Sequence, residues 1–176
     1  MCIRDSYNID TKKVRVEGAK WHSSKQYSVK LEGAKIAGYQ ASLLVLLRDK
    51  KYVENVKKWT DKLSKFLKKE IYERMDIDTS EYSLEFRHIG LNSTLGELEK
   101  NIRSPVEVGV LCLITSKNQI STEIAKLINP FLLHFPLSSN EELPTFAFPF
   151  SPVHSDRGCV YELSLIHISE PTRLHG

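Results

Sequence analysis

The sequence lacks long apolar segments and has few cysteines. Its longest wholly apolar run, residues 43–47, is far shorter than the ~20 residues of a membrane-spanning helix, so we expect no segment to cross a bilayer. Only 3 cysteines occur among 176 residues, which excludes a disulfide-rich scaffold. No P-loop, dinucleotide-binding fingerprint or cluster of metal-ligating residues occurs. The sequence therefore predicts no cofactor and no metal site.

The composition is that of an ordinary folded domain. Hydrophobic residues make up 41% and charged residues 27% of the chain, which is enough apolar material for one core. The net charge of +3 is too small to argue for a nucleic-acid partner by itself. We therefore predict one soluble domain with no membrane partner and no nucleic-acid partner.

Both ends of the chain resemble translated sequencing-library adapter. Residues 1–6 read MCIRDS, which is the translation of a transposase recognition sequence, and residues 163–176 begin with its reverse complement running into adapter. We therefore expect these ends to be artefacts and residues 7–162 to be a fragment truncated at both ends. Two cysteines remain in it, Cys112 and Cys159, and their spacing favours reduced thiols of a cytoplasmic protein.

Alternating apolar and polar residues predict strands at residues 14–16, 27–31 and 82–89. More continuously apolar runs at residues 39–47 and 106–115 predict two central strands of a sheet. The first two strands each end in Glu-Gly-Ala-Lys, which we interpret as a turn at the strand exit.

Two segments have the spacing of helices. Apolar residues recur at three- and four-residue steps over residues 50–72, and Asp49 is placed to cap this helix. Lysines cover its other face, which we interpret as solvated, with phosphate or an acidic partner as the alternative. Ser116 and Gln119 form a capping box for a second helix, which Pro130 should kink or end. The order β-β-β-α-β-β-α predicts a two-layer α+β sandwich with helices on one face of a mostly antiparallel sheet.

Three segments in the last third of the chain form an unusual block. They are residues 129–136 (NPFLLHFP), 143–152 (LPTFAFPFSP) and 157–162 (RGCVYE). The block resembles the C-terminal part of the acyclic terpene utilisation (AtuA) family, in which an LLH segment leads into FAFPFSP and then RGxVYEF. Upstream segments fit the same family in order, so the resemblance covers most of residues 7–162.

The resemblance implies a longer cytoplasmic protein whose N-terminal domain this chain lacks. Such a protein is associated with the breakdown of branched acyclic terpenoids, such as citronellol and geraniol, through CoA thioesters. Its implied partners are a small-molecule or acyl-CoA substrate and the missing N-terminal domain. The resemblance supplies no catalytic mechanism, so it leaves open whether the protein is an enzyme and whether it forms a homo-oligomer.

Two side chains are candidates for catalysis. The near-neutral pKa typical of histidine would suit His134 as a general acid or base, and the guanidinium of Arg157 would suit a carboxylate or a CoA phosphate. A buried histidine and an exposed turn arginine are the structural alternatives. The candidates for a substrate pocket are Phe148, Phe150, Ser151 and Tyr161. Ser151 lacks the sequence context of a nucleophile, and the phenylalanines that alternate from Phe146 would equally suit one buried face.

The alternative function is a binding or oligomerisation module without chemistry. An RNA-binding form of it would use the basic helix and the aromatic residues Tyr39, Tyr82 and Phe86 on a sheet face. A converging apolar cleft around His134 and Arg157 would favour an enzyme, whereas a flat apolar face would favour assembly.

Overall fold

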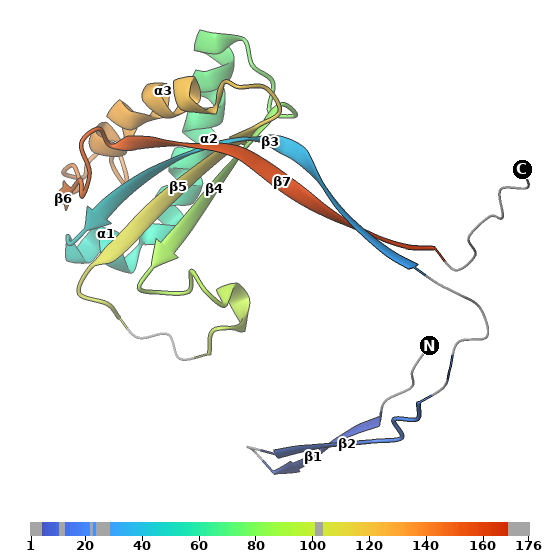
Figure 1. Cartoon of the computed structure of the whole chain (residues 1–176). Helices are drawn as coiled ribbons and strands as arrows, with labels where there is room; N and C mark the ends of the chain where they lie inside the picture. The colour runs from blue at the N-terminus through green and yellow to red at the C-terminus, as the bar shows by residue number, and fades with distance from the viewer. Residues whose placement is uncertain (1–4, 11–12, 22, 24–28, 101–103, 169–176) are drawn as a thin grey trace, which may run out of the picture. The chain divides into compact units, whose positions relative to one another are not determined.

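The structure, a computed structural model, describes residues 5–10, 13–21, 23, 29–100 and 104–168 (Figure 1). The chain divides into two compact units. The smaller unit consists of Met1–Gly33 with Leu163–Gly176, and the larger unit is Ala34–Glu162. In the smaller unit, β1 (Asp5–Asp10) pairs antiparallel with β2 (Lys13–Glu17), which confirms the strand predicted at residues 14–16.

A five-stranded, mostly antiparallel sheet forms the base of the larger unit, and β5 lies inside it as predicted. The strand order is β4 (Tyr82–Ile89), β5 (Val108–Ser116), β3 (Val29–Leu47) and β6 (Phe146–Ala147), with β7 (His154–Ile168) also paired to β3. The apolar run of β5 suits this position because an interior strand is flanked on both sides. The strand predicted at residues 82–89 is confirmed as the edge strand β4.

Three helices cover one face of this sheet (Figure 1). They are α1 (Lys50–Glu54), α2 (Val56–Met75) and α3 (Ser121–His134), and a short 3₁₀ helix, η1 (Gly96–Leu98), lies between β4 and β5. The predicted cap is confirmed, because the Asp49 carboxylate accepts hydrogen bonds from the backbone N–H groups of Lys51 at 2.8 Å and Tyr52 at 3.3 Å. The predicted α+β sandwich is therefore the observed architecture.

The core lies between the helices and one face of the sheet. The register pairs Leu43 with Cys112 and Val45 with Val110, so that alternate residues of β3 and β5 face the helices together. On the helical side, Trp59, Leu63 and the other apolar residues of α2 at three- and four-residue steps are fully buried. Removing this apolar surface from water is the main favourable term in the folding of the unit.

Two aromatic residues tie the segment after α3 to the helical layer. The Trp59 indole Nε1–H donates to the Phe135 carbonyl oxygen at 2.8 Å. The Tyr52 hydroxyl donates to the Glu142 carbonyl oxygen at 2.6 Å and accepts from the Leu137 N–H at 3.0 Å. Proline-rich chain that forms little regular structure is thus held by side chains of α1 and α2.

Two predictions about the strands and helices before β4 are wrong. Residues 29–31 of the first predicted strand and residues 39–47 belong to the single strand β3, which runs through the second Glu-Gly-Ala-Lys without a turn, while residues 27–28 lie outside the described part of the chain. Pairing with β7, far along the chain, supports this stretch, and local sequence carries no sign of that partner. The helix predicted over residues 50–72 is two helices, because Asn55 leaves the helical conformation and its side-chain amide donates to the Lys51 carbonyl oxygen at 2.9 Å.

The predicted boundaries of the last helix are also wrong. Ser116 is the last residue of β5, and its hydroxyl donates to the Asn118 carbonyl oxygen at 2.7 Å instead of capping a helix. The helix begins at Ser121 after an uncapped Ile120. Pro130 lies inside α3 and does not end it. Its ring occupies the exposed side of the helix, where water can satisfy the carbonyl that a missing N–H leaves unpaired.

We expect Trp59→Phe to lower the free energy of unfolding by about 1–3 kcal/mol, because the Phe135 carbonyl oxygen loses its donor in a part-buried site. Urea unfolding measures this difference. Lys58→Ala, at the exposed neighbouring position, is the control and should change the free energy by less than about 0.5 kcal/mol. Equal stability of Trp59→Phe and the wild-type chain would contradict the role of this bond.

Candidate functional site

The sheet separates the two residues predicted to be catalytic. His134 is the exposed last residue of α3, on the helical side. The Arg157 Nε–H on β7 donates to the Ser42 hydroxyl at 2.8 Å. Ser42 lies on β3 between Ala41 and Leu43, which face the helices, so its side chain and Arg157 lie on the other face. The structure does not bring His134 and Arg157 into one cleft.

The four residues predicted to line a substrate pocket do not converge either. Phe148 is half-buried against the core and its ring lies 5.4 Å from that of Phe146 in an edge-to-face contact. Phe150 is 55% exposed and Tyr161 is 61% exposed, and Ser151 is also exposed. The expectation of one buried aromatic face is therefore wrong at Phe150, where Pro149 and Pro152 break the alternation of a strand.

The aromatic residues of the RNA-binding alternative are not on an open sheet face. Register places Tyr39, Ser116 and Tyr82 side by side, and Tyr82 is buried beneath the helices. Phe86 lies on the same side of β4 and packs against the core. Side chains in these positions cannot stack on RNA bases.

A cavity with a volume of about 620 Å³ lies between α2, β4 and residues 92–96. Residues Lys57, Thr60, Asp61 and Ser64 of α2 line it at the spacing of one helical face. Five successive residues of β4, Leu84 to His88, form another wall. The cavity thus combines a cation, an anion, hydroxyl groups and an imidazole with the apolar surface of Leu84 and Phe86.

His88 is held in this cavity by a hydrogen bond between its Nε2 and the Thr60 hydroxyl oxygen, 3.0 Å away. The single hydroxyl hydrogen of Thr60 is directed to the helix carbonyls, with Val56 O at 3.0 Å and Lys57 O at 3.1 Å. When this hydrogen is directed to one of the carbonyls, the Thr60 oxygen accepts from the imidazole, the ring proton is on Nε2 and Nδ1 carries a lone pair.

Burial lowers the pKa of His88 below its ordinary value, because desolvation disfavours the charged imidazolium. Nearby Asp61 opposes this shift and Lys57 reinforces it. The wide spacing of the histidines along the sequence did not identify His88 as a site residue. The alternation of the strand contained the signal, since His88 follows Tyr82, Leu84 and Phe86 on the face directed toward the core.

The lysines of α2 remain on the surface, as predicted. Lys57, Lys58, Lys62 and Lys65 line a second cavity of about 500 Å³ beside the first. One of them has a structural contact, because the Lys62 ammonium donates to the Leu137 carbonyl oxygen at 2.8 Å.

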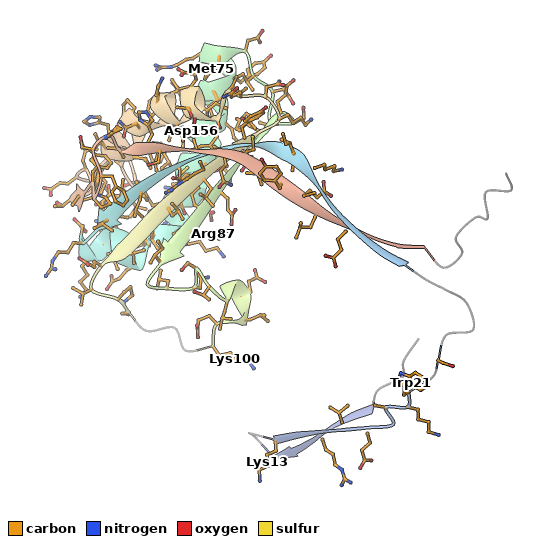
Figure 2. All side chains as sticks on the ribbon, in the orientation of Figure 1. Lys13, Trp21, Met75, Arg87, Lys100 and Asp156 are labelled. Carbon is orange, nitrogen blue, oxygen red and sulfur yellow. The ribbon has the colours of Figure 1, made fainter. Side chains whose placement is uncertain are left out.

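The sheet face opposite the helices carries an apolar strip. Leu44 lies opposite Leu111 in the register, and Leu46 and Leu113 continue the strip along their strands. All four are half-buried. On the edge strand β4, Arg87 and Glu85 border the strip and form an ion pair with Nε 2.7 Å from Oε1. Figure 2 shows Arg87 on the edge strand β4 and Asp156 on β7, which pairs with β3.

Two cysteines, Cys112 and Cys159, lie in the described part of the chain. Both are free thiols, and burial raises the pKa of Cys112 to about 12, so this thiol stays protonated and unreactive. Within the described residues, no three His, Cys, Asp or Glu side chains are grouped so that they could hold a metal ion. None of the described helices is long and apolar enough to cross a membrane.

No protein-family model matches this chain, and no curated protein or solved structure matches it. The observations that bear on function are therefore the cavity beside His88, the apolar strip on the open face of the sheet and the sequence resemblance.

We expect the stability of the chain to fall as the pH drops below about 6.5, because the unfolded chain then takes up a proton at His88 more readily than the folded chain. This component levels off once the pH is below the folded-state pKa. Replacing His88 with Gln should flatten that part of the profile, as measured by urea unfolding at a series of pH values. His134→Gln, at an exposed site, should keep the wild-type profile. Identical profiles for His88→Gln and the wild type would contradict the assignment.

Proposed function

We propose that this chain carries the C-terminal α+β domain of an AtuA-like protein, which handles branched acyl or acyl-CoA compounds in acyclic terpenoid breakdown. The sequence block at residues 129–136, 143–152 and 157–162 supports this proposal. All three segments lie in the compact unit Ala34–Glu162.

Within such a protein, we infer that the role of this domain is to dock rather than to break bonds. The observation that carries this inference is the apolar strip of Leu44, Leu46, Leu111 and Leu113 on the helix-free face of the sheet. An antiparallel sheet with one face in water normally carries polar residues there, as β4 does with Ser83, Glu85 and Arg87. An apolar centre bordered by charged residues is the usual composition of an interface.

The occupant that we propose for this strip is the N-terminal domain implied by the resemblance. Arg157, from the most distinctive sequence block, lies on the same face as the strip, because it contacts Ser42 next to Leu44 on β3. Docking here would place Arg157 near the boundary of the two domains, where its guanidinium would orient the interface. His134, beyond the helical layer, would take no part.

The test is to recover the reading frame outward from residues 7–162, express its N-terminal domain and titrate it with this chain. We expect a 1:1 complex by calorimetry, and Leu111→Lys should weaken it at least about tenfold because it buries a charge at the centre of the interface. Tyr72→Lys, at a side chain of α2 that is 57% exposed, is the matched control and should bind as the wild type does. A frame that encodes no such domain, or full binding by Leu111→Lys, would refute the proposal.

We propose as a second role that the cavity beside His88 binds a branched terpenoid alcohol. The His88 Nδ1 lone pair would accept the hydroxyl hydrogen, and the apolar side chains of Leu84, Phe86 and Leu95 would contact the branched chain. The Lys57 ammonium lines the same cavity as a donor to the hydroxyl oxygen. A volume of about 620 Å³ is ample for one small ligand.

Citronellol is the probe for this second role, with binding followed by NMR shifts of the cavity residues. We expect saturable binding that Lys57→Met weakens several-fold through loss of a charged donor. Binding should also weaken as the pH falls through the pKa of His88, because the protonated ring cannot accept a hydrogen bond. The control is Lys58→Met, whose side chain lines only the second of the two cavities. Equal loss in both variants would indicate a general effect of lysine removal and would refute this site.

A further inference from the structure

The edge strand β4 lacks three of the usual protections against pairing with another strand. Its sequence, YSLEFRHI, contains no proline and no lysine. It pairs with β5 over residues 82–89 without a shift of register, so no bulge bends it away. Natural proteins commonly use prolines, lysines or bulges to keep a regular edge from associating. The absence of all three leaves eight residues of regular strand at the edge.

The space beside this edge is not filled by the described part of the chain. The cavity of about 620 Å³ is lined by five successive residues of β4, from Leu84 to His88. In an antiparallel edge strand, every second residue directs its N–H and C=O away from the paired neighbour. The cavity therefore borders backbone groups that point outward from the sheet, and the described strands supply β4 with no partner other than β5.

The charges on β4 are arranged so that the strand complements itself. Two copies related by a two-fold axis at Phe86 would pair antiparallel, with Glu85 of each copy opposite Arg87 of the other. Both side chains are about half exposed and already form an ion pair within one strand. Unlike charges directly opposite each other across an antiparallel pair are stabilising.

Neighbouring two-fold registers lack this complementarity. An axis at Glu85 would place the two Glu85 side chains opposite each other, and an axis at Arg87 would do the same for the two arginines. Like charges in direct opposition destabilise a strand pair. A two-fold axis normal to the sheet also keeps the helical face of each copy on the same side, so both cores stay covered.

We propose that a second copy of this chain binds along the free edge of β4, antiparallel and centred on Phe86, to form a dimer with one continuous sheet. This edge borders the leucine strip without including it, so the dimer stands or falls independently of docking to an N-terminal domain. It would compete with a ligand in the cavity beside His88, because residues 84–88 of β4 line that cavity as well. Because the contact is an edge with flanking polar groups, we expect the dimer to depend on protein concentration and to weaken with salt.

The experiment measures the mass of the full chain by sedimentation equilibrium over a wide range of concentrations. We expect the wild-type chain to dimerise, and Glu85→Arg and Arg87→Glu each to weaken dimerisation by about tenfold or more, because each makes both cross-strand pairs repulsive. The double variant, with the two charges exchanged, should dimerise as the wild type does. Glu123→Lys, at an exposed site on α3, has the same type of charge change and should have no effect.

An equimolar mixture of the two single variants provides the decisive measurement. One variant then presents two cations and the other two anions, so both cross-strand pairs are attractive and a heterodimer should form. Misfolding of a single variant cannot produce this rescue. A chain that stays monomeric throughout, a dimer that tolerates both single changes, or a mixture that fails to associate would overturn the proposed dimer.

Discussion

The pairing of β3 with β5 is the constraint on which the rest of the larger unit depends. Nine consecutive residue pairs join these strands, from Tyr39 with Ser116 to Leu47 with Val108. A slip of one residue would turn the buried Leu43 and Val45 outward and direct the leucine strip into the core. The register therefore decides at once which residues form the core beneath the helices and which form the open face.

Strand order and register also place the polar and titratable side chains of β4 at the edge of the sheet. With β5 and β3 inside the sheet, β4 is left as an edge strand, and the parity of its residues directs His88 toward α2 and Glu85 with Arg87 toward the open face. Thr60 is the next residue after the buried Trp59 on α2, and its hydroxyl oxygen lies 3.0 Å from the His88 Nε2. The apolar strip thus follows from the pairing of β3 with β5, and the free edge and the polar cavity follow from the pairing of β4 with β5.

The resemblance to the AtuA family and the geometry bear on function in different ways. The resemblance rests on the last turns of α3 and on residues after it, a stretch that Tyr52 and Trp59 of the helical layer help to hold in place. The geometry draws attention instead to β4, β5 and α2, which lie before that segment. The resemblance and the geometry are both consistent with a domain that docks and associates through its sheet while another domain carries the reaction.

Local sequence determined the features whose cause is local. The spacing of apolar residues predicted α2 and β4, the continuous apolar run predicted that β5 is central, and Asp49 predicted the start of α1, since its carboxylate bonds N–H groups two and three residues away. Only tertiary structure decided the continuity of β3, the bond between Thr60 and His88, and the separation of His134 from Arg157 by the sheet. Each of these depends on which strands pair and in which register, and pairing joins residues whose separation along the chain leaves no trace in periodicity.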